Sequence, residues 1–400
     1  MTGSLRYDMP FRCLLSREGE LSDTQIDAEL SAEAHTVLGR DDVMFTPLAH
    51  GQRIGVTSGV FRAQAGDTRA VVKIVAPAAD VEGKVWRGSH DPANYRFWER
   101  EALFYEAGQP QAYTDAGIAL PDLMGVFRRG GGEISLWMRD VSGNGGAAWT
   151  VQRTEERARQ LGRAQGTCLL DDGWRKSAVP FSRNVLRDYL DTPDATSPDI
   201  DWDMLENSDA WDTRLMRTHF GGQLREDVLR LCRERYEFVR WGEALPHTLC
   251  HHDLWPNNVF EHDGRLVLVD WAFAGEGWVG GDIGNFVSDT ALDLLRPSEE
   301  LPALDEGVFR GYVQGLRDAG YDADEKAVRL GMCVMAAKWT WLIPVMLTRA
   351  TRDSHEVYGS QAVDADRLYA ERANVFRMLV AWAAQGRALA AELFPAAAQP

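Results

Sequence analysis

The chain has few of the residues that mark secreted, zinc-binding or membrane proteins. Its 400 residues include five cysteines, which form no CxxC pair and no paired spacing. A scattered, odd set is typical of a reducing compartment rather than of a disulfide framework or a zinc site. The first residues lack the basic and apolar regions of a secretion signal. The most apolar stretch, 332–347, is short and interrupted by Lys338 and Pro344, which predicts a buried core helix. We therefore expect a cytoplasmic protein.

Basic residues are also scarce relative to acidic ones. Lys and Arg number 43 against 60 Asp and Glu, so the formal net charge is −17. Binding to nucleic acid or to an anionic membrane needs basic patches that replace counterions, and this composition opposes both. We expect no nucleic-acid and no membrane partner, and a small-molecule partner that is neutral or cationic. The composition does not define an oligomeric state.

The pattern of apolar residues divides the chain into three parts. Residues 1–42 form a polar leader with one short helix expected at about 22–38. From 43 to 141, β-branched runs and glycine turns predict a small antiparallel sheet with one helix. From 142 to 400, apolar residues at helical spacing predict a larger, mainly helical lobe. The expected fold class is therefore α+β, with two lobes joined by a glycine-containing hinge near Gly143.

Turn and cap signals locate the elements of the N-terminal lobe. Gly66 and the glycines at 130–132 each separate apolar runs, which predicts two β-hairpins. Asp91 followed by Pro92 predicts the start of the helix, and Gly108 predicts its end.

The C-terminal part reads as helices around one hairpin. Helices are expected at about 150–166 and 225–244. Between them, the stretch 188–212 carries nine acidic residues and no basic one. We interpret it as a solvated loop or short-helix segment, with the lining of a cationic substrate pocket as the alternative. From about 283 to 395 several amphipathic helices follow.

The hairpin lies within the stretch CHHDLWPNNVFEHDGRLVLVDWAFAG, residues 250–275. Asp263-Gly264 between two apolar runs is a strong short-range hairpin signal. With the turn at 262–265, residue 258 faces residue 269, so Asn258 and Asp270 emerge together at the open end. Asp253 precedes Asn258 by five residues, on the loop that enters the same end.

These three side chains suit phosphoryl transfer. Mg²⁺ binds oxygen ligands, takes few protein carboxylates and completes its shell with phosphate oxygens and water. A further carboxylate can orient a substrate hydroxyl and accept its proton. Phosphoryl transfer depends mostly on such positioning and charge neutralisation.

Three segments carry a family resemblance. His251-His-Asp-Leu-Trp-Pro-Asn-Asn258 resembles the HGDxxxxN catalytic loop of aminoglycoside phosphotransferase-like kinases, Val269-Asp-Trp271 their I-D-W metal motif, and Gly280-Gly-Asp-Ile283 the segment beyond it. The family includes antibiotic, choline, ethanolamine and sugar kinases, and the resemblance implies a bilobal protein-kinase-like fold. One departure is His252, where glycine is commonest, and we expect it to be an exposed loop residue.

The resemblance implies a role for each matching residue. Asp253 would be the catalytic base that orients the acceptor hydroxyl, and Asn258 and Asp270 would be the Mg²⁺ ligands. His251 and Asp282 would brace the loop. A plain hairpin with polar ends is the alternative, but the joint spacing favours the catalytic interpretation.

A kinase also needs a lysine that binds the ATP phosphates and a glutamate that holds it. Lys73 is the charged residue of an otherwise apolar strand, on the face of Val71 and Val75, and either points into a cleft or marks an edge strand. The catalytic loop favours the cleft. Of the glutamates on the next helix, we select Glu101, because its R-E-x-x-F-Y context resembles that of choline-kinase-like members.

The remaining nucleotide contacts follow from the same resemblance. Residues 51–62 look like the family's nucleotide loop, in which Ser58 and the backbone at Gly59 would bind phosphates. Backbone groups of Asp140 and Val141, at the hinge strand, would bind adenine.

The acceptor is the least determined part of the function. Our leading hypothesis is an ATP- and Mg²⁺-dependent kinase that phosphorylates a hydroxyl of an aminoglycoside or related amino sugar. The alternatives are a metabolic kinase of choline, ethanolamine, a sugar or homoserine, and a pseudokinase that only binds nucleotide. Trp202, Trp211 and Trp255 are expected to stack on the acceptor or simply to pack.

Overall fold

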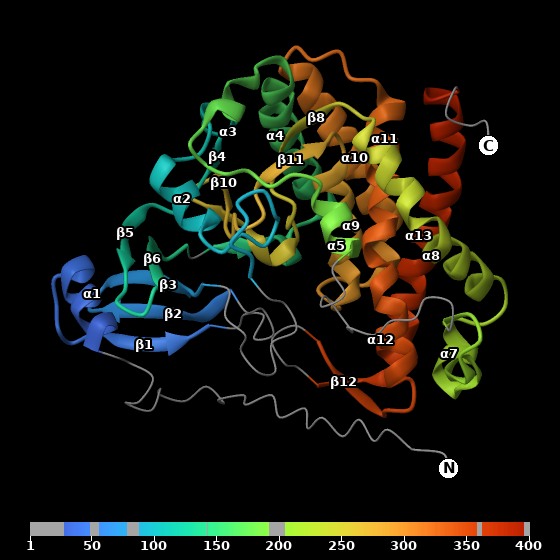
Figure 1. Ribbon diagram of the computed structural model, residues 1–400, viewed down its shortest axis with the longest axis horizontal. Helices are drawn as coiled ribbons and strands as arrows, with labels where there is room; N and C mark the ends of the chain where they lie inside the picture. The colour runs from blue at the N-terminus through green and yellow to red at the C-terminus, as the bar shows by residue number, and fades with distance from the viewer. Residues whose placement is uncertain are drawn as a thin grey trace.

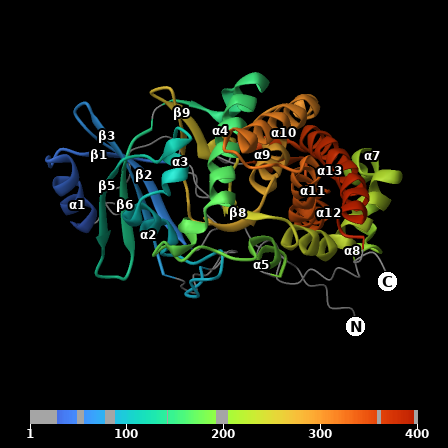
Figure 2. The same ribbon diagram turned by 90° about the horizontal axis from the view of Figure 1, so that it is seen from above.

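Two lobes lie side by side in the protein (Figures 1 and 2), which confirms the predicted α+β class. The smaller lobe, at the N-terminal end, is built on an antiparallel sheet, and the larger one is mainly helical. The computed structural model describes six stretches of the chain: residues 28–48, 56–77, 88–141, 143–191, 205–357 and 362–395.

The N-terminal sheet has five strands in the order β1-β2-β3-β6-β5. Both predicted hairpins are confirmed, since β2 pairs with β3 and β5 with β6 in antiparallel register. Gly66 and Gly132, in their turns, have φ of 60° and 84°, where glycine avoids the strain of a side chain. The strands are β1 (Met44–Pro47), β2 (Thr57–Ala65), β3 (Thr68–Val75), β5 (Leu123–Arg128) and β6 (Ile134–Arg139).

Helix α1 (Ala28–Leu38) packs on the outer face of this sheet. Its Leu30 and Ala34 join the apolar core of the lobe. Its buried Glu33 accepts hydrogen bonds from Arg129 at 2.8 Å and from Ser135 at 2.6 Å. A buried carboxylate requires such partners, so α1 is fastened to the sheet. The part of the predicted helix before residue 28 lies outside the described residues.

The two faces of strand β3 have different surroundings, the apolar core on one side and a cavity on the other. Val72 is fully buried in the core beneath α1. Val71, Lys73 and Val75 alternate with it and line the cavity between the lobes. The period of two in a β-strand therefore carries Lys73 to the cavity side.

The predicted helix start at Asp91-Pro92 is wrong. Helix α2 (Arg100–Ala107) begins later, and turns occupy the residues before it. The reason is Arg100, fully buried, whose guanidinium donates to the carbonyl oxygens of Pro92, Asn94 and Tyr95. Those oxygens would otherwise accept bonds along a helix. The predicted end is confirmed, because Gly108 adopts φ of 76° after the last turn.

The C-terminal lobe confirms the two long helices expected from spacing, which are α4 and α8. Helix α4 packs closely on α10, and a Cβ on Gly162 would lie 2.2 Å from the carbonyl oxygen of Tyr312. The helices of this lobe and its approach are α3 (Gln111–Asp115), α4 (Val151–Leu170), α5 (Val185–Asp191), α7 (Arg214–His219), α8 (Gln223–Glu243), α9 (Gly281–Leu292), α10 (Leu301–Asp318), α11 (Glu325–Val334), α12 (Leu342–Arg349) and α13 (Ala365–Leu393).

The expected hairpin is present with the predicted register. Arg265 pairs with His262 and Leu268 with Val259, and the Val269 N–H donates to the Asn258 carbonyl at 3.0 Å. The lobe nevertheless contains more β-structure than this hairpin, in short strands that the apolar pattern does not predict, with β8 paired to β11 and β12 to β13. The strands of this lobe and its approach are β4 (Ile118–Ala119), β7 (Asn144–Gly145), β8 (His247–Cys250), the hairpin strands β9 (Val259–His262) and β10 (Arg265–Leu268), β11 (Gly275–Trp278), β12 (Ser354–Glu356) and β13 (Ala362–Asp364).

The apolar stretch 332–347 is not one continuous α-helix. Between α11 and α12 the chain forms the 3₁₀ segment η7 (Met335–Trp341). The helical stretch Glu325–Arg349 is long and apolar enough to cross a membrane by composition, but 78% of its most apolar window is buried inside the protein. That burial favours the interpretation as a core segment.

Candidate active site

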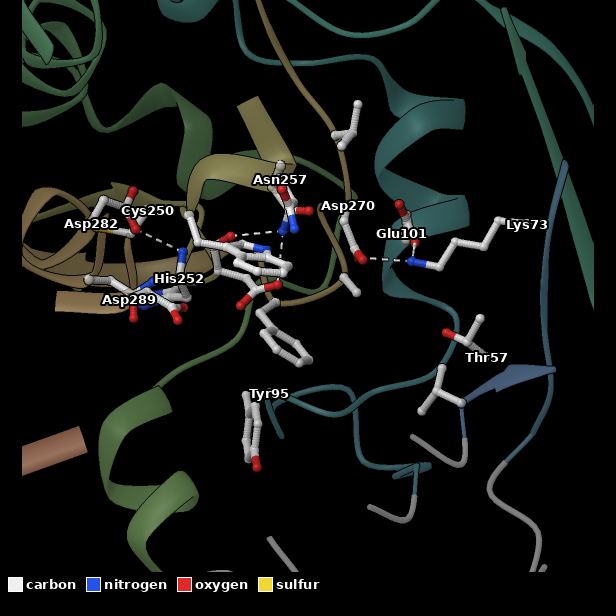
Figure 3. Close-up of a pocket in the computed structure, with 18 of the residues that line it drawn as sticks. Thr57, Lys73, Tyr95, Glu101, Cys250, His252, Asn257, Asp270, Asp282 and Asp289 are labelled. Carbon is white, nitrogen blue, oxygen red and sulfur yellow. Dashed lines mark hydrogen bonds and ion pairs between the residues drawn. The ribbon is translucent and has the colours of Figure 1, made fainter. Parts of the chain in front are cut away.

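A cavity of about 550 Å³ lies between the lobes. Strands β2, β3 and β6 line one side, while the 250–258 loop, α9 and η7 line the other. Figure 3 shows Lys73 and Asp270 toward one end of the drawn residues and His252 and Asp289 toward the other. We refer to these two ends as the nucleotide half and the acceptor half.

Lys73 lies at the centre of the nucleotide half. Its Nζ lies 2.5 Å from Glu101 Oε2 on α2 and 2.8 Å from Asp270 Oδ1 after β10. Burial alone would lower the pKa of the ammonium, but the two carboxylates outweigh it and raise that pKa. The structure therefore joins three predicted site residues from three separate elements in one ion network.

Asp270 is held in an unusual backbone conformation. Its φ of 61° is rare for a residue other than glycine and often accompanies functional constraint. Although burial would raise the pKa of its carboxyl, the adjacent Lys73 holds that pKa below its ordinary value. The side chain keeps 40% of its surface exposed, so an ionised carboxylate faces the cavity.

Asn258 connects the hairpin to the catalytic loop. Its Nδ2 donates to Asp253 Oδ2 and to the Asp253 carbonyl oxygen, each at 2.9 Å. Both amide hydrogens are thereby used, which leaves Oδ1 as the atom available to a ligand. Within the described residues, Asp253 Oδ1 has no hydrogen-bond partner either. Burial raises the pKa of the Asp253 carboxyl, and Lys338 opposes that shift.

Asp282 and His251, which were predicted to brace the catalytic loop, both hydrogen-bond to its backbone. Asp282 is buried at the start of α9, and its two oxygens accept the backbone N–H groups of His251 and His252 at 2.8 Å. His251 Nε2 donates to the Val269 carbonyl at 2.9 Å, and its Nδ1 accepts the Asp253 N–H at 3.3 Å. His251 thus ties the loop to the strand that leads to Asp270.

The packing of α4 on α10 supports this brace. Gln165 Nε2 donates to Asp282 Oδ2 at 2.8 Å, and Gln165 Oε1 accepts from the Tyr312 hydroxyl at 2.5 Å. All three side chains are buried. A buried network in which each polar group has a partner is rigid and fixes one geometry.

His252 differs from the expectation of an exposed loop residue. It is half-buried, lines the cavity, and its Nε2 donates to the Glu276 carbonyl at 3.1 Å. Its φ of 66° explains why glycine would suit the position. Desolvation lowers the pKa of its imidazole to about 4, so the ring is neutral near pH 7.

The oxygens of Asn258 and Asp270 fit a divalent cation shared with phosphate. No group of three or more His, Cys, Asp or Glu side chains suited to a metal occurs among the described residues. A dedicated protein cage is thus absent from that part of the chain. One amide oxygen and one ionised carboxylate, open to the cavity, match the preference of Mg²⁺ for few protein ligands.

Of the remaining predicted nucleotide contacts, Asp140 and Val141 line the cavity, whereas Ser58 and Gly59 do not. Thr57 lines the cavity, whereas Ser58 points away from it and donates to Glu133 Oε1 at 3.0 Å. Gly59 lies in β2, and Asp140 and Val141 line the cavity at the end of β6. The Asp140 N–H donates to the Arg69 carbonyl at 3.3 Å.

Three further residues were missed by the sequence reasoning. Arg100 donates to the Ala272 carbonyl at 3.0 Å and so secures the loop that follows Asp270. Lys338 on η7 and Asp289 on α9 line the acceptor half. A single charge within an apolar run, such as Lys338, predicts only an interruption of that run.

The aromatic candidates have separate positions. Trp255 lines the cavity, whereas Trp211 is buried in the core of the helical lobe. Trp202 and most of the acidic stretch, 192–204, lie outside the described residues.

The antiparallel sheet, the helical lobe and the lysine–glutamate pair that faces the aspartate loop form the bilobal arrangement that the sequence resemblance implies. A family model described as choline/ethanolamine kinase matches residues 204–306, which contain Asp253, Asn258, Asp270 and Asp282. The resemblance predicted from the motifs is confirmed over this stretch.

Individual proteins resemble the chain to different extents. Choline kinase B2 of Caenorhabditis elegans is 38% identical over 65 residues, which are 15% of this chain and 18% of the relative. The chain thus matches about a fifth of that relative's length. Two solved structures are similar over much of the chain at 12% identity. Choline kinase LicA of Streptococcus pneumoniae has a TM-score of 0.48 over 89% of this chain and 99% of its own. Amicoumacin kinase hAmiN, solved with AMP-PNP, Ca²⁺ and Ami, has a TM-score of 0.47 over 84% and 88%.

Proposed function

We propose that the protein is an ATP-dependent phosphotransferase that transfers the γ-phosphate to a hydroxyl of a small molecule. The observation that carries this proposal is the convergence of Lys73, Asp270, Asn258 and Asp253 in one cavity. Phosphoryl transfer needs positioned phosphates and a nucleophile oriented by a carboxylate, and these residues provide both. A pseudokinase would not require an uncommitted carboxylate oxygen at Asp253.

Each residue has a distinct task in this proposal. Lys73, fixed by Glu101, binds phosphate oxygens of ATP. A divalent cation, Mg²⁺ in our proposal, bound by Asn258 and Asp270 would neutralise charge on the phosphates. Asp253 Oδ1 accepts a hydrogen bond from the acceptor hydroxyl and takes its proton as the bond to phosphorus forms. Asn258 keeps the carboxylate of Asp253 in place through Oδ2.

The acceptor we propose is a small hydroxyl compound with an amino group. An aminoglycoside or related amino sugar, with a role in antibiotic resistance, is the first candidate. The Asp289 carboxylate lines the acceptor half, and within the described residues no hydrogen bond or ion pair joins it. Asp289 is half-buried, and a carboxylate in such a site without a partner favours a ligand that brings a positive charge. The match to choline/ethanolamine kinases supports amino alcohols as the second candidate.

A screen of ATP consumption tests the reaction and the acceptor together. The purified protein would be given Mg-ATP with aminoglycosides, amino sugars, choline, ethanolamine, sugars and homoserine, and ADP and the phosphorylated product would be measured. Acceptor-dependent ADP release with one phosphate added to the acceptor is expected. Tight nucleotide binding without transfer to any acceptor would favour the pseudokinase instead.

A further inference from the structure

Lys338 is a fixed cation in the acceptor half of the cavity. Its Nζ donates to Asn285 Oδ1 at 2.6 Å. Asn285 is fully buried, and its Nδ2 donates to the carbonyl oxygen of Leu254 at 2.8 Å. Because the nitrogen is used in this way, Oδ1 must face the lysine. The ammonium is therefore tied through one amide to the residue that follows Asp253.

The 3₁₀ conformation of η7 directs Lys338 into the cavity. Side chains three residues apart lie on the same face of a 3₁₀ helix, and Lys338 and Trp341 both line the cavity. A run of seven residues is long for this conformation, and it separates two α-helices. An α-helix would rotate these side chains by about 20° per residue relative to the 3₁₀ geometry.

Aromatic rings surround the ammonium. Nζ lies 5.1 Å from the ring centroid of Trp339 and 5.5 Å from that of Tyr189. Aromatic faces at this distance attract cations and are used in proteins to bind quaternary ammonium groups. Here the protein's own ammonium lies against these rings. A second cation at that position would be repelled by Lys338.

The charge of Lys338 is not neutralised by an ion pair. Among the described residues, no carboxylate lies within 4.0 Å of Nζ, and Asp289, on helix α9 of the same side of the cavity, also has no ion-pair partner. A lysine has three N–H donors, of which the Asn285 bond uses one. Lys338 and Asp289 thus line one cavity without an ion pair between them. Burial raises the pKa of the Asp289 carboxyl well above its ordinary value and Lys338 opposes that shift, so a cationic group bound beside Asp289 would favour its ionised form. A ligand that carries both charges would satisfy both groups.

We propose that Lys338 determines the specificity of the acceptor site by binding a carboxylate, so that the acceptor is a zwitterionic hydroxy compound of the amino-acid type. Its amine would pair with Asp289 while its hydroxyl reaches Asp253. This inference rests on the proposed kinase function and replaces the amino sugar as first candidate by an acceptor of the amino-acid type. It also excludes choline as the preferred acceptor, because choline brings a cation and no anion.

A matched pair of acceptors shows the effect of the acceptor's carboxylate on kcat/KM. Serine and ethanolamine differ by that group alone, and homoserine and choline extend the comparison. For each, kcat/KM would be measured through ADP release. We expect kcat/KM for the better of serine and homoserine to exceed that for ethanolamine by about tenfold or more. Turnover confined to choline or to aminoglycosides would overturn the inference and leave the kinase reaction intact.

Removing the charge of Lys338 tests the residue itself. Lys338→Gln keeps a donor for Asn285 but loses the ammonium, and Lys326→Gln, on the exposed part of α11, is the control. We expect Lys338→Gln to reduce the preference for a carboxylate about tenfold, mainly through the KM of the acceptor, with the KM of ATP unchanged. An unchanged preference would overturn the inference.

Acceptor binding without turnover separates the two proposals. Serine, homoserine and ethanolamine would be titrated calorimetrically into the protein loaded with Mg²⁺ and a non-hydrolysable ATP analogue. Tighter binding of a carboxylate compound, lost in Lys338→Gln, supports the role of Lys338 even if no phosphate is transferred, and then the kinase proposal alone fails. Equal or undetectable binding of the three compounds overturns the inference even in an active kinase.

Discussion

The nucleotide half and the acceptor half of the cavity differ in how their charges are balanced. Lys73 contacts two carboxylates, and the network holds its geometry without a ligand. Lys338 has an amide partner, Asn285, but no ion-pair partner among the described residues. Asp289 also has no ion-pair partner among them. A balanced site is preorganised for one constant ligand, ATP in our proposal. An unbalanced site depends on the charges that its ligand brings.

The largest effect that distinguishes the two halves is expected at Asp253, the proposed proton acceptor. Asp253→Asn removes the proton acceptor but retains a side chain that can contact Asn258. We expect kcat to fall on the order of 10²–10⁴-fold, while Mg-ATP binding, measured by calorimetry, stays within about threefold because the balanced half is untouched. Asp263→Asn is the matched control, since this turn residue is exposed and asparagine tolerates its φ of 48°. Unchanged turnover in Asp253→Asn would refute the mechanism.

Asp270→Asn should disturb the balanced half instead. Asparagine suits the left-handed backbone of this residue, so the change removes charge with little strain. We expect turnover to fall on the order of 100-fold and nucleotide binding to weaken, with a higher Mg²⁺ concentration needed for half-maximal activity. A variant with a normal Mg²⁺ dependence would contradict the assignment of Asp270 as a metal ligand.

Lys73→Met should raise the KM of ATP about tenfold by removing one charged phosphate contact. It should also destabilise the protein by roughly 3 kcal/mol, because the Glu101 carboxylate is left buried without its cation. The double variant Lys73→Met/Glu101→Gln should recover much of the unfolding temperature but not ATP binding. If both properties recovered together, Lys73 would be a structural residue only.

The smallest effect concerns His252 and pH. Its folded pKa of about 4 lies below the usual 6.5, so the unfolded chain binds the proton more readily. The stability that the neutral, buried ring contributes is fully present above pH 6.5 and is lost as pH falls from there toward 4. The loss at pH 5 is about 2 kcal/mol of unfolding free energy. His252→Asn, which tolerates the positive φ, should flatten this part of the stability curve in denaturant titrations at pH 5 and pH 8. An equal pH dependence in both proteins would show that the ring is not buried as a neutral group.

The comparison also explains what could be predicted from the sequence. Strand alternation and hairpin register, which are local rules of period two, place Lys73 on one face of its strand and bring Asn258 and Asp270 together, while the family resemblance implies their roles. Lys338 and Asp289 depend on how α9 and η7 pack, a long-range arrangement that local patterns do not encode. The helix start at Asp91 was mispredicted for a similar reason, because Arg100 binds the carbonyls of that segment from outside it.

Arg100 has a consequence for how the proposed activity is controlled. Its guanidinium binds carbonyl oxygens of Ala272 and Pro180 in the helical lobe as well as those of the loop before α2. Glu101 is the next residue, so the glutamate of the lysine pair is anchored to the opposite lobe. An outward movement of α2 would leave the buried guanidinium of Arg100 without hydrogen-bond partners, which costs free energy. We therefore expect α2 to stay in place and the rate to follow the concentrations of the two substrates, without an on–off switch at this helix.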